Sequence, residues 1–267
     1  MPSGIITLTS DFGLGDPYVS VMKGVILSIN PHARLIDVSH QLKAGSILEA
    51  SALIQEVYPF FPEGTVHLVI VDPGVGTKRR PVVVATEAHL FVGPDNGLFW
   101  PIIEAFEPVR IVQLTERKYF LPQVSQTFHG RDIFAPVAAY LSLGVDPMKM
   151  GSNVDDPVRL EVPSAREENG VFRGQVIRVD CFGSLITNIR RKDLEKFLGP
   201  ARPVVRVGKL IVEGVLRTYA EARAGETLAL FGSSDRLEIA VNLGRACERV
   251  EIDSEEIIGT EVEVSRL

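Results

Sequence analysis

The sequence predicts an α/β fold class in two domains: a mostly parallel-sheet α/β domain over residues 1–160 and a smaller all-β, barrel-like domain over residues 173–267. In the first half, short apolar runs alternate with helical patterns in the order β-α-β-α-β, which is typical of a parallel sheet covered by helices. In the second half, short apolar runs follow one another with glycine turns between them, which favours a small barrel or sandwich. A segment with little periodicity separates the two halves, and we place a linker at residues 161–172.

The individual elements follow from local patterns. A capping-box pattern, Ser46 with Glu49, predicts the start of one helix, and Pro101 is compatible with the first turn of another. In the first half, strands are expected at residues 5–9, 35–38, 68–71, 82–85, 90–92 and 109–114, and helices at 18–29, 47–57, 98–106 and 133–143. In the second half, strands are expected at residues 175–179, 204–207, 210–212, 228–231, 237–241 and 262–264, and a helix at 192–198.

Composition and charge narrow the class of function. The chain has 267 residues, 45% of them hydrophobic, and a formal net charge of −6 without a basic tract, which argues against a nucleic-acid partner. Its two cysteines, Cys181 and Cys247, form no metal-binding spacing, so we expect no structural zinc and a reduced, cytoplasmic protein. We expect neither a signal peptide nor a membrane span, because no apolar run approaches about 18 residues.

One stretch, residues 67–85, joins a buried strand to a polar loop. The loop begins with Asp72 at the carboxyl end of a continuous apolar run and reaches Arg79 after two glycines. Ligands of open α/β sheets bind at such strand ends. An acid and an arginine held by one loop could polarise a substrate or a water, and they could equally form a structural ion pair. The loop is not a Walker A motif, because neither Ser nor Thr follows Lys78.

Other acids occupy comparable positions. Asp11, Asp16 and Asp95 also follow expected strands of the first domain, so we expect them to gather with Asp72 along one edge of the sheet. Such a cluster could bind metal ions, or it could bind the hydroxyl and ammonium groups of a polar, cationic ligand. The pattern alone leaves both explanations open.

Three further polar segments are candidates for a site. His129 stands before a glycine in a loop that leads into the expected helix at residues 133–143, which is the most functional setting among the five histidines. A lone loop histidine is, however, more often a solvated or capping residue. In the second half, the segments 180–188 and 232–235 interrupt expected strands, and ordinary hairpin turns explain each of them taken alone.

Taken in order, these segments give the chain a family resemblance. It rests on the motifs Thr9-Ser10-Asp11-Phe12-Gly13, Phe61-Pro62-Glu63-Gly64-Thr65-Val66, Val71 to Thr77 with Arg79 and Arg80, Pro94-Asp95-Asn96-Gly97-Leu98, Phe128-His129-Gly130-Arg131-Asp132 and Asp180 to Asn188. With these motifs the chain resembles, almost end to end, the S-adenosyl-L-methionine (SAM) hydrolases, also called SAM hydroxide adenosyltransferases, which are relatives of the SAM-dependent fluorinase and chlorinase.

The resemblance implies a fold, an assembly and a reaction. It implies an N-terminal α/β domain, a C-terminal barrel-like domain and a homotrimer with sites between subunits. The reaction would be hydrolysis of SAM to adenosine and L-methionine by attack of water on ribose C5′, with no metal and no cofactor.

The resemblance also assigns roles to residues of this chain. The catalytic set around the attacking water would be Asp72, Arg79 and His129, which the halogenating relatives lack. Substrate-binding residues would be Asp11 at the ribose diol, Asp16, Asp180 and Ser233 near the methionine part, and Phe182 and Asn188 on the adenosine side. In the last segment the chain has Ser234 and Val241 where halogenating relatives carry arginines.

Three alternatives stay open from the sequence. A SAM-dependent halogenase would form a 5′-halo-adenosine in place of adenosine. A metal-dependent phosphohydrolase built on the acids would lose its activity with a chelator. A SAM or adenosine sensor would bind its ligand without turnover.

Overall fold

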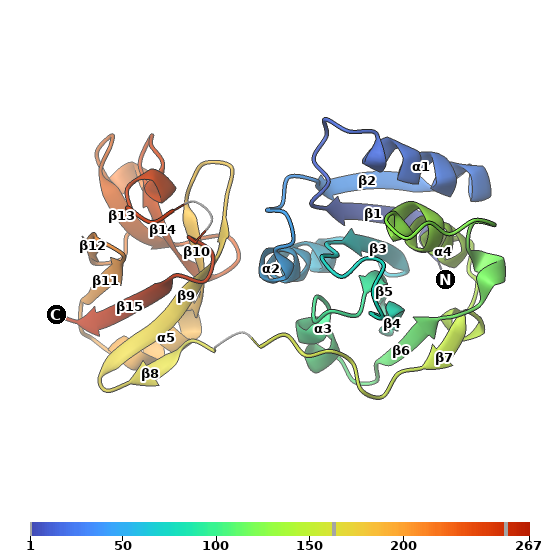
Figure 1. The fold of residues 1–267 in the computed structure, drawn as a ribbon. Helices are drawn as coiled ribbons and strands as arrows, with labels where there is room; N and C mark the ends of the chain where they lie inside the picture. The colour runs from blue at the N-terminus through green and yellow to red at the C-terminus, as the bar shows by residue number, and fades with distance from the viewer. Residues whose placement is uncertain (1, 162–163, 254–255) are drawn as a thin grey trace. The chain divides into compact units, whose positions relative to one another are not determined.

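The computed structural model describes residues 2–161, 164–253 and 256–267, which divide into two compact units, Met1–Glu161 and Val162–Leu267 (Figure 1). Two residues of the expected linker, 162 and 163, lie outside the described residues. The same expected linker includes a short strand, β8 (Arg166–Glu168), and the start of β9 (Val171–Val179).

The first unit is built on a seven-stranded mixed sheet in the order β2-β1-β3-β5-β4-β6-β7, which confirms the predicted α/β class. The strands β2, β1, β3 and β5 are parallel, and β4, β6 and β7 continue the sheet in antiparallel pairing. The reversal at β4 and β5 follows from the three residues between them, because so short a connection can join only antiparallel neighbours. Their bounds are β1 (Ile5–Ser10), β2 (Arg34–Ser39), β3 (Thr65–Ile70), β4 (Pro81–Ala85), β5 (His89–Pro94), β6 (Arg110–Leu114) and β7 (Gly151–Asn153).

Helices cover both faces of this sheet. The helices α1 (Tyr18–Ile29) and α4 (Ala135–Ser142) pack on the face to which Leu68 points. The helices α2 (Ile47–Val57) and α3 (Trp100–Ala105) share the opposite core with Val69. Because successive side chains of a strand point to opposite faces, β3 contributes to both cores, and this explains its uninterrupted apolar run.

Local signals at two helices are confirmed. Ser46 Oγ accepts the backbone N–H of Glu49 at 3.4 Å, as the capping-box pattern predicts. Pro101 lies in the first turn of α3, where its missing N–H costs no intrahelical bond. The expected helix at residues 133–143 begins as a π-helical turn, Gly130–Phe134, which continues directly into α4.

The second unit is a nearly closed antiparallel barrel. Its strands run in the order β12-β11-β15-β9-β10-β14-β13, with β8 beside β9. A bridge between Leu216, which follows β12, and Leu230 of β13 brings the two ends of the sheet together. The remaining bounds are β10 (Leu185–Arg190), α5 (Arg191–Leu198), β11 (Pro203–Val207), β12 (Leu210–Glu213), β13 (Thr227–Phe231), β14 (Arg236–Val241) and β15 (Glu261–Arg266).

Besides β8, the barrel strand β10 was not expected. Thr187 and Asn188 interrupt its apolar run, so the pattern resembled a polar loop. In the structure Thr187 is fully buried and donates its hydroxyl to the Leu237 carbonyl at 2.8 Å. This hydrogen bond satisfies a polar group inside the barrel, and only the neighbouring strand supplies its acceptor.

Candidate active site

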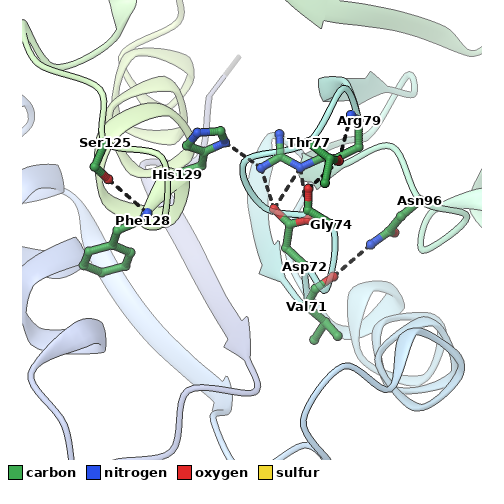
Figure 2. Close-up of polar contacts among 9 residues, drawn as sticks. All are labelled: Val71, Asp72, Gly74, Thr77, Arg79, Asn96, Ser125, Phe128 and His129. Carbon is green, nitrogen blue, oxygen red and sulfur yellow. Dashed lines mark hydrogen bonds and ion pairs between the residues drawn. The ribbon is translucent and has the colours of Figure 1, made fainter.

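The loop after β3 carries an acid and an arginine on a tightly folded backbone. The Val75 N–H donates to the Asp72 carbonyl at 3.2 Å, and Thr77 Oγ1 donates to the Gly74 carbonyl at 2.7 Å. From the next loop, Asn96 Nδ2 donates to the Val71 carbonyl at 2.9 Å (Figure 2). These bonds fix the point at which the chain leaves the sheet, and so they fix the direction of the Asp72 side chain.

Asp72 and Arg79 form a nearly buried ion pair. Arg79 Nε lies 3.0 Å from Asp72 Oδ1 and 2.9 Å from Oδ2, and Arg79 Nη2 lies 2.5 Å from Oδ2. Only 5% of the Asp72 side chain and 9% of the Arg79 side chain are exposed. The guanidinium also lies over the Phe134 ring at 5.2 Å from its centroid. Such a fork geometry orients the carboxylate as well as neutralising it.

His129 completes the set from a different part of the chain. Arg79 Nη2 donates to His129 Nδ1 at 2.7 Å, so the guanidinium lies between the carboxylate and the imidazole (Figure 2). Burial and the adjacent Arg79 charge lower the pKa of His129 below its usual 6.5. Since arginine only donates hydrogen bonds, we assign the neutral tautomer with its proton on Nε2 and the lone pair of Nδ1 facing Arg79.

The two loops meet through a glycine. Gly76 has φ +78°, and a Cβ at this position would lie 2.6 Å from the Gln126 carbonyl oxygen. A residue without a side chain is therefore required where the Asp72–Arg79 loop passes the segment that leads to His129. That segment is itself anchored, because the fully buried Asp132 accepts the Ser125 N–H at 2.8 Å and Ser125 Oγ accepts the Phe128 N–H at 3.0 Å.

A pocket of about 400 Å³ opens beside this set. Asp72 and His129 line it, whereas Arg79 stands behind them. Asp11 lines the same pocket, and its Oδ2 accepts the Gly45 N–H at 2.8 Å. The pocket therefore brings together an acid from the loop after β1, an acid from the loop after β3 and an imidazole from the turn before α4.

Aromatic side chains form one wall of the pocket, a feature that the sequence analysis missed. The rings of Phe12, Tyr18 and Phe128 contact one another with centroids 5.2–5.9 Å apart. Phe12 and Phe128 each stand next to a predicted site residue and belong to the motifs of the family resemblance, and these were the signals in the sequence. Aromatic faces beside carboxylates suit a ligand with a positive charge and apolar groups.

Two of the acids do not join this pocket. Asp16 is exposed in the loop before α1. Asp95 is buried and accepts hydrogen bonds from Arg80 Nε at 2.8 Å and from the Val158 N–H at 2.9 Å. Asp95 therefore does not line the pocket with Asp11 and Asp72, and its ion pair instead ties residues 156–158 to the sheet.

The second unit has its own pocket, of about 950 Å³, lined by Asp180, Phe182 and Ser233. Asp180 Oδ1 accepts the N–H groups of Phe182 and Ser184 at 3.0 and 2.8 Å, so this carboxylate shapes the turn that presents Phe182. Phe182 is 73% exposed. Asn188 is not among the lining residues, and its Oδ1 accepts the Gln175 N–H at 2.8 Å.

The second pocket also contains a hydrogen-bonded acid and phenol that the sequence analysis did not single out. Glu238 is buried in β14 and accepts a hydrogen bond from the Tyr219 hydroxyl at 3.2 Å. Burial and the Glu238 carboxylate raise the pKa of Tyr219. A glutamate inside the apolar run of residues 237–241 was the available signal, since a buried acid needs partners.

The described residues contain no group of three or more His, Cys, Asp or Glu side chains placed to hold a metal ion. Cys181 and Cys247 are free thiols. None of the helices in the part of the chain that the structure describes has the length and apolar character needed to cross a lipid bilayer.

An α/β unit that carries an acid–arginine–imidazole set beside a pocket, followed by a barrel-like unit, has the arrangement of a two-domain enzyme. Comparison with known proteins identifies the family. Residues 6–151 match the SAM hydroxide adenosyltransferase N-terminal domain, and residues 174–258 match the SAM hydroxide adenosyltransferase C-terminal domain. The chain belongs to the SAM hydroxide adenosyltransferase family.

Individual relatives agree with this assignment. The (R)-S-adenosyl-L-methionine hydrolase of Salinispora tropica is 39% identical over 250 residues, covering 92% of this chain and 94% of that protein. The enzyme of the same name from Thermus thermophilus is 39% identical, with 90% and 92% covered. A crystal structure of a conserved protein from Thermotoga maritima has a TM-score of 0.89 at 36% identity, covering 98% of this chain and all of that one. A fluorinase of Actinoplanes is more distant, at 29% identity.

Proposed function

We propose that this protein hydrolyses SAM to adenosine and L-methionine by in-line attack of an activated water on ribose C5′. The observation that carries the proposal is the hydrogen-bonded set of Asp72, Arg79 and His129 beside a pocket. Relatives at 33–39% identity over most of the chain are named (R)-S-adenosyl-L-methionine hydrolases, which supports the same activity here.

The chemistry requires positioning and a proton acceptor. The water oxygen forms a bond to C5′ while the bond from C5′ to sulfur breaks, and the electron pair of that bond neutralises the sulfonium. Methionine therefore leaves without needing a proton. The proton that water loses must pass to a protein group and then to solvent. Positioning of the reactants can supply about 7–11 kcal/mol of barrier reduction, and a general base about 10²–10⁴-fold in rate.

The geometry favours Asp72 as the proton acceptor. In the assigned tautomer His129 already accepts the Arg79 N–H at Nδ1 and holds a proton at Nε2. A further hydrogen bond joins His129 to the backbone of Ser125, which holds the imidazole in place. The Asp72 carboxylate can take the proton, because its two oxygens have more acceptor positions than Arg79 occupies. Arg79 stays protonated and orients both partners.

The aromatic wall supports a cationic substrate. Phe12, Tyr18 and Phe128 present ring faces and edges to the pocket that Asp11 and Asp72 also line. A sulfonium carries its charge on apolar carbon substituents, so it is stabilised by aromatic faces without strong hydrogen bonds. In this proposal Asp11 accepts hydrogen bonds from the ribose diol.

The remaining substrate-binding roles stay predictions. They are the contacts of Asp16, Asp180 and Ser233 with the methionine part and of Phe182 and Asn188 with the adenosine side. The homotrimer, the in-line (SN2) geometry and a cytoplasmic location are likewise proposals; sedimentation velocity would test the first of them.

The experiment that tests this proposal compares hydrolysis of the two sulfonium epimers of SAM. Purified protein is incubated with (R)-SAM and with (S)-SAM, with and without EDTA, and adenosine and methionine are quantified by chromatography. We expect equimolar products, unaffected by EDTA, with the (R) epimer preferred as the names of the relatives suggest. Asp72→Asn, which keeps the size of the side chain, should abolish turnover. No adenosine from either epimer, or near-native turnover by this variant, would overturn the proposal.

A halogenase is the second candidate, because fluorinases are among the relatives. Chloride or fluoride added to the same reaction distinguishes the two. A 5′-halo-adenosine product would favour the halogenase, and adenosine alone favours the hydrolase. The Asp72–Arg79–His129 set, which the resemblance assigns to the hydrolases, is the reason we prefer water as the nucleophile.

A further inference from the structure

A chain of hydrogen bonds lies behind the pocket, outside the residues assigned so far. Ser10 Oγ lies 2.7 Å from His40 Nδ1, and His40 Nε2 lies 3.1 Å from Asp37 Oδ1. Lys23 Nζ lies 2.5 Å from the other oxygen of Asp37. The order serine, histidine, aspartate resembles that of a hydrolase triad. Ser10, however, is fully buried at the end of β1 and has no access to a substrate, so it is not a nucleophile.

The Asp37 carboxylate determines which group donates in each hydrogen bond of this chain, because a carboxylate can only accept. The Asp37 carboxylate accepts, and hydrogen bonds from Lys23 and His40 lower its pKa although its partial burial acts to raise it. In a neutral His40 the proton is therefore on Nε2, and Nδ1 accepts the Ser10 hydroxyl proton. The Ser10 oxygen is then left to accept the Phe12 N–H, which lies 3.4 Å away.

The same residues hold the backbone on both sides of Asp11. Ser10 precedes it, the Phe12 N–H points to Ser10 Oγ, and the Gly13 N–H donates to the His40 carbonyl at 2.7 Å. Gly13 has φ +67°, so the chain turns sharply here. Asp11 Oδ1 accepts no hydrogen bond from the described residues, and Oδ2 is held by Gly45. The free oxygen is the one that a ligand could engage.

We propose that Ser10, His40 and Asp37 form a positioning relay that fixes Asp11 and Phe12 for binding of the nucleoside part of the substrate. The identity of that substrate, SAM, is taken from the proposed function. None of its three members touches the ligand. They act through the loop at residues 11–13, whose acid and aromatic ring both line the pocket.

Thr7 offers a matched control on the same strand. Thr7 Oγ1 lies 2.9 Å from His67 Nδ1, and both residues are fully buried, so the pair has the same chemistry as Ser10 and His40. Neither Thr7 nor His67 lines the pocket. Thr7→Val therefore removes a buried hydroxyl–imidazole bond without affecting the loop at residues 11–13.

The test compares Ser10→Ala, Ser10→Thr and Thr7→Val in steady-state kinetics with SAM, in hydrogen exchange of the peptide at residues 11–16 and in thermal unfolding. Loss of one buried hydrogen bond corresponds to roughly a tenfold change in an equilibrium. We expect Ser10→Ala to raise KM about tenfold with kcat within about threefold, and to speed exchange in that peptide. Ser10→Thr keeps the hydroxyl and should therefore have a KM and an exchange rate close to those of the wild type. Thr7→Val should lower the melting temperature and leave KM and the exchange rate unchanged.

Two outcomes overturn the relay: a KM effect of Ser10→Ala no larger than that of Thr7→Val, or unchanged exchange of the peptide at residues 11–16. If the wild-type protein does not hydrolyse SAM, the proposed function fails, and the exchange measurement still decides the relay. If the wild-type protein hydrolyses SAM and Ser10→Ala behaves as the control, only the relay fails.

Discussion

Arg79 and His129 are 50 residues apart in the chain, yet Nη2 of the arginine lies 2.7 Å from Nδ1 of the histidine. This contact determines which nitrogen of His129 carries the proton, because the guanidinium only donates. It also makes the imidazole and the Asp72 carboxylate, which flank the same cation, respond together to any change at Arg79.

Removal of the Arg79 cation should impair both catalysis and folding. We expect Arg79→Met to lower kcat by about 10²–10³-fold, the range for losing one electrostatic donor. It should also destabilise the fold by about 3–5 kcal/mol, because Asp72 is left nearly buried and unpaired. Arg80→Met is the control, since Arg80 pairs with Asp95 and Asp156 away from the pocket. Equal kcat in the two variants would contradict a role for Arg79.

Activity should resist mild acid. The pKa of His129 is lowered by burial and by Arg79, so the neutral form persists below the usual pKa of 6.5. Protonation at Nδ1 would break the hydrogen bond from Arg79. We expect kcat/KM to be level from pH 8 to the usual histidine pKa and to fall only at lower pH. His129→Asn keeps a polar atom near the Nδ1 position but has no group that is protonated in this pH range. In this variant the fall of kcat/KM that protonation of the imidazole causes should be absent. A decline in the wild-type protein centred above the usual pKa would count against the assigned tautomer.

The stability of the protein should fall in acid for a different reason. His67 is fully buried in β3, and burial followed by repulsion from His89 lowers its pKa to about 3. The unfolded chain takes up this proton near pH 6.5 and the folded chain does not, so stability is lost as the pH falls from 6.5 towards 3. The slope is at most about 1.4 kcal/mol per pH unit. Urea unfolding of the wild type and of His67→Gln at several pH values checks this, and equal slopes would refute it.

The approach of the two loops should depend on Gly76. Gly76→Ala would place a methyl group 2.6 Å from the Gln126 carbonyl oxygen and would strain a backbone with φ +78°. We expect a loss of kcat of at least about tenfold, because Arg79 and His129 are pushed apart. Gly170→Ala is the matched control, since its φ of +80° carries the same backbone strain with no atom within 4 Å of the added Cβ. Its activity should be unchanged; a parallel loss in both variants would point to backbone strain alone.

Much of the fold was predictable because its signals are local. The apolar run of β3, the cap at Ser46 and the glycine loop after Asp72 each depend on residues adjacent in the chain. The juxtaposition of Asp72 with Arg79 was predictable for the same reason, because one short loop holds both. The family resemblance added His129, which no spacing argument connects to them.

The features that were missed depend on tertiary partners. Asp95 follows a strand just as Asp72 does, so the sequence does not distinguish the two acids. The structure distinguishes them, because Asp95 pairs with Arg80, which precedes the neighbouring strand β4. Strand β10 was missed because the acceptor for the Thr187 hydroxyl lies on β14. The Ser10–His40–Asp37 relay joins the end of β1 to β2, and periodicity says nothing about hydrogen bonds between side chains of different strands.

The bridge between Leu216 and Leu230 has a consequence for colloidal behaviour. An open sheet offers rows of unsatisfied amides and carbonyls that can recruit strands from other molecules, whereas a sheet that meets itself offers few. The sheet of the first unit is open, and its two edge strands, β7 and β2, could pair with strands of other molecules. Such pairing is disfavoured because β7 is only three residues long and β2 carries the charged residues Arg34 and Asp37. Short or charged margins of this kind disfavour stacking into fibrils, so both sheets are protected against amyloid-like polymerisation by their borders.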